Sequence, residues 1–460
     1  MVGPLRICVV LSPMIVIAGC GDGGGTDLPT LDDLLEPGDL VEDMQVPGTS
    51  QNGPPPDDTP PVRDDLPAVS ATTIDICADN GGRFFTEDLE LIDHTVGPDY
   101  LVTCNVQFSD GTLTIQRGVE VIFESAFGLY IENDAEIRAL GGYDGELRAE
   151  PSIRFRGDSV SGAPSWNGVF VGSASVDNLI ENVEIIGAGF QPISGIFYPS
   201  GSSALLLDNT LAIRGLSITG SGGHGIYMGG SAAFGQLQDV VIGDTAGHPL
   251  LMPSHVAGTQ LADNVGNVSF TSDAEGNLAS IGLYDNLLTT ERLGGRSSYV
   301  FANHALPYHS LSGLSGSGAS GVVIDPGVDF IMAGGTGITS GGGVGGRLTI
   351  TGTSEEPVTF RGAEALAGFW SGITYVSDSE LNRIDNVTIS DAVNGVLVDG
   401  RSSNNITTRV TNSRISNTSE CGIRVSTPFS SLAFETAGNV YTQNGAGDMN
   451  DEGCLGNFME

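Results

Sequence analysis

Apolar and polar residues alternate along the chain from about residue 72 onward. The stretch 113–139 reads LTIQRGVEVIFESAFGLYIENDAEIRA. Several of its apolar residues occupy odd-numbered positions, namely Leu113, Ile115, Val119, Val121, Phe123, Leu129, Ile131 and Ile137. The positions between them carry a mixed set that includes Thr114 and Glu120. A period of two is typical of β-strands with one buried face, so the pattern predicts short strands centred near residues 115, 122, 130 and 137.

These strands follow one another too closely to form hairpins throughout. Their centres lie 7 to 8 residues apart, and three steps cover 22 residues (137 − 115). Few Asn-Gly pairs are present to form tight turns. The spacing suits one coil of a three-sided solenoid, in which each strand pairs in parallel with the strand one coil below. We therefore expect an all-β fold of stacked coils.

The second half of this region repeats the first. PSIRFRGDSVSGAPSWNGVFV (151–171) returns as PVTFRGAEALAGFWSGITYV (357–376), with Trp370 lying 204 residues after Trp166 (370 − 166). The segments DNLIENVEI and LNRIDNVTI keep this offset, while LTIQRGVEVIF returns as VVIDPGVDFIM and TLAIRGLSITGSGGHGI as ITTRVTNSRISNTSECGI. We assign two copies of one scaffold, at 72–265 and 266–460, whose loops differ in length.

The repeated segments resemble the right-handed parallel β-helix repeats of the pectin-lyase-like superfamily, and in particular its non-catalytic group of bacterial surface lipoproteins. The resemblance covers about residues 100–450. It implies an internally duplicated, right-handed parallel β-helix. We expect Trp166 and Trp370 to cover apolar surface at joints where the chain turns between faces. The alternative role for these two side chains is stacking against a bound sugar.

Four cysteines fall in pairs at the two ends of the β-helix region. Cys77 and Cys104 lie in the segment 72–104, and Cys421 and Cys454 lie in 421–454. No Cys-x-x-Cys or nearby histidine supports a metal site. We predict two disulfides, Cys77–Cys104 and Cys421–Cys454, which fit an oxidising compartment. The two segments are the expected caps of the solenoid, because a bare end exposes a strand edge.

The N-terminal segment is typical of a targeting sequence. An apolar run follows Arg6 and leads to Ile17-Ala18-Gly19-Cys20, which resembles the bacterial lipobox. This resemblance implies a lipoprotein signal peptide at 1–19 and lipidation of Cys20, and the alternative is an ordinary secretory signal. Residues 20–71 are rich in Asp, Glu, Pro and Gly, so we expect a disordered tether. The expected location is the bacterial cell envelope, on the outer membrane.

The net charge limits the partners. The chain has 18 basic residues, all of them Arg, and 56 acidic residues, which gives a formal charge of −38. Repulsion from phosphate therefore excludes a nucleic-acid partner and opposes electrostatic docking on anionic lipid. The charge could attract divalent cations such as Ca²⁺, but no cofactor is indicated and no metal-ligand cluster is found.

Catalytic motifs of the superfamily are incomplete here. Gly223-His224-Gly225 matches one element of the polygalacturonase-type pattern, but the Asp-Asp pairs lie in the tether and the chain has no Lys. His224 also aligns with Cys421 in the second copy, which favours a turn residue. Lyases of this fold use a cationic base, and Arg is the only such strong base available. The candidates for a divergent catalytic site are Arg214, His224 and Tyr227.

Two classes of function follow from these observations. The first is a lipid-anchored envelope protein, expected to be monomeric, with a non-enzymatic binding or structural role toward a glycan or a surface protein. The second is a divergent polysaccharide lyase or glycoside hydrolase that acts on acidic polysaccharide. A cluster of Asp, Arg and His on one exposed wall would favour the enzyme.

Overall fold

The computed structural model describes residues 73–445 and 454–455, apart from short gaps. The gaps are 80–83, 95, 146–152, 160–161, 193–200, 271–277, 286, 289–292, 294–295, 305, 318–320, 343–345, 377–378, 400–406 and 427–432. The described residues belong to one compact unit, which extends from Thr59 to Glu460. The predicted signal peptide, Cys20 and the tether lie outside them. Within the described residues, no helix combines the length and apolar character needed to span a membrane.

The described residues form four long sheets whose strands are parallel, with one exception at the C-terminal end. The eleven-stranded sheet contains β1 (Ile74–Asp75), β3 (Leu89–Leu91), β4 (Tyr100–Val102), β6 (Thr112–Gln116), β7 (Glu120–Phe123), β9 (Glu136–Leu140), β10 (Ile153–Gly157), β12 (Leu179–Ile186), β14 (Thr210–Thr219), β16 (Ala233–Ile242) and β18 (Val268–Phe270). The fourteen-stranded sheet contains β2 (Phe84–Phe85), β5 (Val106–Phe108), β8 (Gly128–Ile131), β11 (Gly168–Val171), β13 (Ser203–Leu207), β15 (His224–Met228), β17 (Leu250–Met252), β19 (Ile281–Leu283), β22 (Tyr308–Ser310), β25 (Asp329–Met332), β28 (Val358–Gly362), β31 (Val387–Ser390), β34 (Arg414–Ser416) and β37 (Val440–Thr442).

Two further sheets belong to the second copy. The seven-stranded sheet contains β20 (Leu287–Leu288), β23 (Leu314–Ser317), β26 (Gly337–Gly342), β29 (Gly372–Tyr375), β32 (Val396–Asp399), β35 (Ile423–Ser426) and β38 (Cys454–Leu455). The six-stranded sheet contains β21 (Ser298–Phe301), β24 (Gly321–Ile324), β27 (Arg347–Thr351), β30 (Arg383–Asp385), β33 (Thr407–Thr411) and β36 (Ala433–Ala437). The short helices are α1 (Ile76–Asp79), α2 (Ser254–Val256), η2 (Ala257–Leu261) and η3 (Ala262–Asn264).

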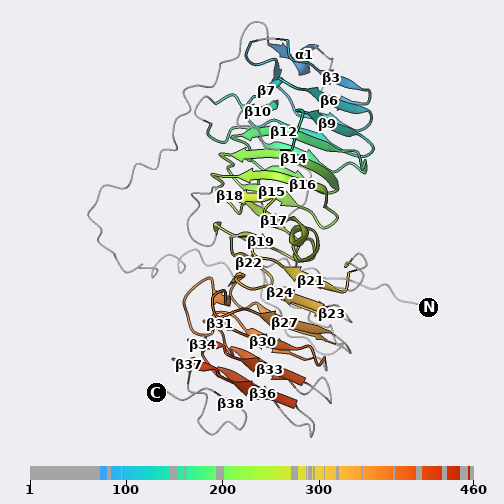
Figure 1. Cartoon of the computed structure of the whole chain (residues 1–460). Helices are drawn as coiled ribbons and strands as arrows, with labels where there is room; N and C mark the ends of the chain where they lie inside the picture. Colours follow the sequence, from blue (N-terminus) through green and yellow to red (C-terminus); the bar gives the residue numbers. More distant parts are fainter. Residues whose placement is uncertain are drawn as a thin grey trace, which may run out of the picture. The chain divides into compact units, whose positions relative to one another are not determined.

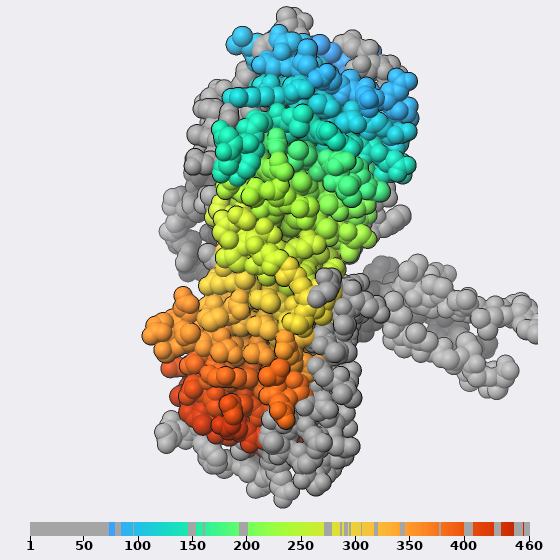
Figure 2. Space-filling model, turned by 45° about the vertical axis from the view of Figure 1, so that its right-hand side comes forward, coloured from blue at the N-terminus to red at the C-terminus, as the bar shows by residue number. Residues whose placement is uncertain are grey.

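This arrangement is a parallel β-solenoid and confirms the predicted fold class. The four strands predicted in 113–139 are β6, β7, β8 and β9, and β6 pairs in parallel with β9 one coil later. Thr112 lies opposite Glu136, so this coil takes 24 residues (136 − 112) rather than the predicted 22. The coils follow one another along the stack, from β6 and β9 near one end to β33 and β36 near the other (Figure 1), and the colour of the surface in Figure 2 changes in the same order.

The solenoid has one continuous apolar core. The odd-numbered residues of β6 and β7 are buried in it, as the alternation predicted. The same core extends through the second copy, where Ile350, Ile384 and Val410 occupy successive coils. A coil cannot bury its inward face alone, so each coil needs its neighbours for stability.

The two copies do not use the same sheets. The strand that ends in Phe-Arg-Gly is β10 in the first copy and β28 in the second. However, β10 belongs to the eleven-stranded sheet and β28 to the fourteen-stranded sheet. The strand after the tryptophan moves likewise, because β11 lies in the fourteen-stranded sheet and β29 in the seven-stranded sheet. The second copy is therefore shifted by one strand, and its equivalent walls are rotated by one face of the coil.

The copies meet in the region between β16 and β22, which we call the junction. The eleven-stranded sheet ends at β18, and the seven- and six-stranded sheets begin at β20 and β21. Among the described strands, those of the fourteen-stranded sheet alone run through the junction, from β17 through β19 to β22. The sequence boundary at 265/266 falls between η3 and β18, and β18 still pairs with β16 of the first copy.

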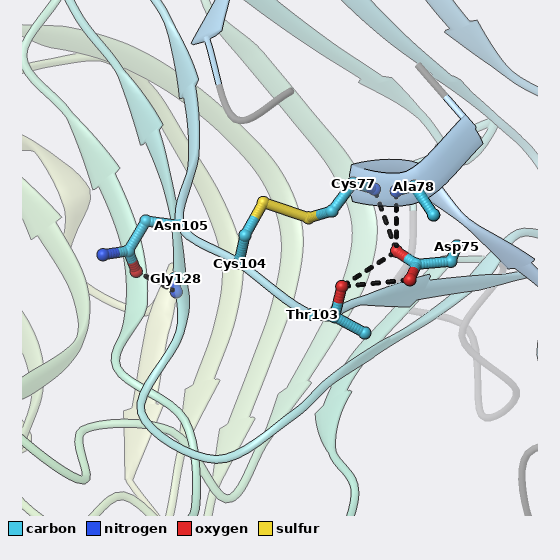
Figure 3. Close-up of a disulfide and its surroundings, with 7 residues drawn as sticks. All are labelled: Asp75, Cys77, Ala78, Thr103, Cys104, Asn105 and Gly128. Atoms are coloured by element: carbon cyan, nitrogen blue, oxygen red, sulfur yellow. Dashed lines mark hydrogen bonds between the residues drawn. A yellow bond between two sulfur atoms is a disulfide. The ribbon is translucent and has the colours of Figure 1, made fainter. Parts of the chain in front are cut away.

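Both predicted disulfides are present at the ends of the stack. Cys77 and Cys104 have Cα atoms 6.1 Å apart, and those of Cys421 and Cys454 are 5.6 Å apart. Near the first bond, Asp75 Oδ1 accepts from the backbone N–H of Cys77 at 2.9 Å, at the start of α1 (Figure 3). At the other end, β38 pairs antiparallel with β35. In the N-terminal segment, the strands β1 to β4 join the parallel sheets.

Candidate functional site

The outer face of the six-stranded sheet carries a groove of about 620 Å³. One register column crosses it: Thr349 lies opposite Arg383, Arg383 opposite Arg409, and Arg409 opposite Glu435. The next residue in β30, Ile384, is buried in the core. Since successive side chains of a strand point to opposite faces, the column faces outward. Its members follow one another at the spacing of the coils, about 4.8 Å.

Three arginines line this groove, and each has a polar partner on the same wall. Arg383 Nη2 donates to Asp385 Oδ2 at 2.6 Å, and Arg409 Nε donates to Glu435 Oε2 at 2.8 Å. The third, Arg347, contacts a serine hydroxyl of β21. The side chains of Arg383 and Arg409 remain 43% and 51% exposed. Their guanidinium groups are therefore held in place while part of each donor set faces the groove.

Asp385 anchors this arrangement. Burial favours its neutral form, but hydrogen bonds from Thr411, Asn412 and Arg383 outweigh burial and lower the pKa of its carboxyl group below the usual value. The Thr411 hydroxyl donates to Asp385 Oδ1 at 2.7 Å, and the Asn412 amide donates at 3.0 Å. The carboxylate is thus ionised near neutral pH and orients Arg383.

Apolar surface adjoins the arginines. Leu381 is 54% exposed, and the half-buried Phe434 packs against the core at the edge of the same groove. Glu380 adds a further acceptor to the lining. The groove therefore offers donors, acceptors and an apolar strip together, a combination suited to a ligand with polar substituents on an apolar frame.

The equivalent wall of the first copy has different chemistry. The β6 segment LTIQ corresponds in sequence to the β24 segment VVID, and a hollow of about 540 Å³ lies over β3, β6 and β9. Its charged lining consists of Asp88, Glu90, Glu136 and Arg138. The duplicated walls have therefore diverged, one toward carboxylates and the other toward arginines.

The structure does not bring the three predicted catalytic residues together on one wall. Arg214 lies on β14 of the eleven-stranded sheet, where it donates to Glu181 at 3.1 Å and to Gln236 at 2.6 Å. His224 and Tyr227 lie on β15 of the fourteen-stranded sheet, with ring centroids 6.4 Å apart. Tyr227 is buried in a small apolar cluster with side chains of neighbouring strands. His224 Nδ1 accepts the backbone N–H of His248 at 3.0 Å.

Neither of the two tryptophans, for which sugar stacking was the alternative role, presents a face to a ligand. Trp166 and Trp370 are both fully buried. Trp166 Nε1 donates to the Ile186 carbonyl at 2.8 Å, and Trp370 Nε1 donates to the Ser390 carbonyl at 2.7 Å. In each copy the acceptor lies 20 residues after the indole (186 − 166 and 390 − 370). The structure thus places both rings in the role of joints, and stacking on a sugar would require the core to open.

In the part of the chain that the structure describes, no group of three His, Cys, Asp or Glu side chains could hold a metal ion. The calcium that the acidic composition suggested therefore has no assigned site.

Sequence reasoning missed the arginine groove, although a signal for it exists. Arg409 follows Arg383 by 26 residues (409 − 383), and Glu435 follows Arg409 by 26 (435 − 409). In a solenoid, residues separated by one coil length share a column. A search for charged residues at this spacing would have found the column.

No protein-family model, curated protein or solved structure matches this chain.

Proposed function

We propose that this chain is a lipid-anchored cell-envelope protein whose β-solenoid binds a glycan without cleaving it. The observation that carries the proposal is the groove over the six-stranded sheet. Its arginines, carboxylates and exposed Leu381 match the hydroxyl groups and apolar ring faces of a sugar chain. The lipobox-like Ile17-Ala18-Gly19-Cys20 and the resemblance to non-catalytic surface lipoproteins support the location.

The wall is suited to binding along its length. Successive coils present side chains about 4.8 Å apart, so an extended ligand can contact several coils in turn. Asp385 and Glu435 hold the guanidinium groups of Arg383 and Arg409 in place. Each guanidinium group has further N–H groups that can donate hydrogen bonds to a ligand. Such a site gains affinity from several modest contacts.

A binding experiment with purified full-length protein tests this proposal. We expect retention on a subset of immobilised bacterial and plant polysaccharides, without release of shorter products. The double variant Arg383→Ala/Arg409→Ala should weaken retention at least tenfold, since it removes two adjacent donors of one column.

Arg424→Ala is the matched control. Arg424 is 39% exposed and pairs with Glu420 at 2.7 Å, but it lies on β35 in the seven-stranded sheet. This variant should retain full binding. Absence of retention on every polysaccharide, or equal loss in both variants, would refute the groove as a glycan site. Product release that disappears in Arg214→Ala or His224→Ala would instead support the enzymatic alternative.

A further inference from the structure

The histidines of this chain are concentrated where its two copies meet. Five of the six lie between residues 224 and 309, at positions 224, 248, 255, 304 and 309. This stretch contains the junction, in which the eleven-stranded sheet ends and two other sheets begin. The strands β17, β19 and β22 of the fourteen-stranded sheet carry the connection through it.

Three of these side chains form a row along that sheet. The rings of His224 and His248 stack with centroids 5.8 Å apart, and those of His248 and His309 meet edge to face at 5.4 Å. His248 is 3% exposed and His309 is 9% exposed. Gly282 of β19 leaves the space for this row, because a Cβ at that position would lie 2.7 Å from His248 Cδ2. The row therefore depends on close packing between coils.

One hydrogen bond of the row, at His224, requires a neutral ring. His224 Nδ1 accepts the backbone N–H of His248, and a proton on this nitrogen would remove the acceptor. His248 Nδ1 lies 3.2 Å from the Ser280 carbonyl oxygen. Burial, together with the adjacent His309 and His224, lowers the pKa of His248 to about 4, against the opposing effect of the Ser280 and Leu278 carbonyls.

Groups on the neighbouring elements surround the row. Tyr227 on β15 faces His224, and Tyr284 packs against Tyr227 with ring centroids 5.6 Å apart. Asp285, which follows β19, lies 3.9 Å from His255 of α2. Burial also lowers the pKa of His304, with the Leu261 carbonyl of η2 opposing. A second buried histidine of the junction, His304, therefore lies beside the helical segment η2.

We propose that the junction is an acid-sensitive hinge, in which protonation of the histidine row loosens β17, β19 and β22 before either copy of the solenoid unfolds. A histidine whose pKa is lower in the closed form binds its proton preferentially in the open form. Opening is therefore favoured as the pH falls from 6.5 toward 4 and is disfavoured above 6.5. This device is independent of the arginine groove.

The size of the effect follows from His248. With a pKa of 6.5 when open and about 4 when closed, lowering the pH from 7.5 to 5.0 raises the opening constant about 30-fold. Hydrogen exchange of the full-length chain, corrected for the intrinsic rate at each pH, measures this directly. We expect β17, β19 and β22 to lose protection about 30-fold over this range, while β7 and β30 change less than about threefold.

Two variants test the assignment to the row. His248→Gln should reduce the pH dependence at the junction to about threefold or less, because the buried titrating group is gone. His309→Gln retains His248 but removes a neighbour that lowers its pKa, so the loss of protection between pH 7.5 and 5.0 should be smaller than about 30-fold, a readout that stands even if the first variant does not fold. His94→Gln is the control, since His94 pairs with Asp99 at 2.8 Å in the first coils. Uniform loss of protection across all sheets, or an unchanged pH profile in His309→Gln, would overturn the hinge.

Discussion

The first copy contains a buried ion pair whose counterpart in the second copy is exposed. Arg156 is 1% exposed, and its Nε donates to Glu120 Oε1 at 2.6 Å. The equivalent residue Arg361 is 40% exposed and lies 3.7 Å from Asp329. The same substitution can therefore be compared at a buried position, Arg156, and at its exposed counterpart, Arg361.

Arg156→Met should be strongly destabilising. Removing one partner of a buried pair leaves an uncompensated charge and costs about 3–5 kcal/mol. Glu120 would retain Arg154 at 3.9 Å, so we expect the lower end of that range, about 3 kcal/mol. Arg361→Met should cost less than about 1 kcal/mol, because exposed pairs contribute little.

Chemical unfolding followed by tryptophan fluorescence measures this difference. The chain has two tryptophans, Trp166 in the first copy and Trp370 in the second. A Trp370→Phe background leaves Trp166 to report on the coils around Arg156. The double variant Glu120→Met/Arg156→Met should recover most of the lost stability, since neither charge of this pair is left buried without its partner. Equal effects of the two arginine substitutions, or no recovery in the double variant, would refute the reasoning.

Three further predictions concern stability. Trp370→Ala should cost about 3–5 kcal/mol, because it empties a fully buried site, and an unchanged melting temperature would contradict this. Removing Cys77–Cys104, which spans 27 residues, by Cys77→Ser/Cys104→Ser should cost about 3–4 kcal/mol, measured by unfolding without reductant so that Cys421–Cys454 stays intact. Gly372→Ala should destabilise the chain in the same assay, since φ is +99° and a Cβ would lie 1.7 Å from the Asn394 carbonyl oxygen. Gly335→Ala, at φ +72° with open space around it, is the control and should cost only about 1 kcal/mol.

The inward residues of the coils were predictable, but the outward ones were less so. Alternation identified Leu113 and Ile115 as core residues because a parallel strand has a strict period of two. Glu120 and Tyr130 occupy outward positions in the same pattern and are nonetheless buried. Burial on an outer wall depends on loops and side chains from other coils, which the local pattern does not contain.

The site was less predictable than the fold for a related reason. Arg383 and Arg409 are adjacent only because the intervening coil takes 26 residues (409 − 383), whereas the coil from Thr349 to Arg383 takes 34 (383 − 349) and that from Thr112 to Glu136 takes 24 (136 − 112). Conversely, Arg214 and His224 are close in sequence but lie on different sheets. In a solenoid, residues that are close in sequence can lie on different walls, whereas residues one coil apart lie side by side on the same wall.

The one-strand shift between the copies has a consequence for how such a chain can change in length. An insertion of whole coils would keep every strand type in its own sheet. Here β28 continues the sheet of β11 rather than that of β10, so the spacing between the copies is not a whole number of coils. The fourteen-stranded sheet accepts this because parallel pairing needs only an inward apolar face, which all three strand types of a coil provide. A solenoid of this kind can therefore differ in length by a number of strands that does not make whole coils.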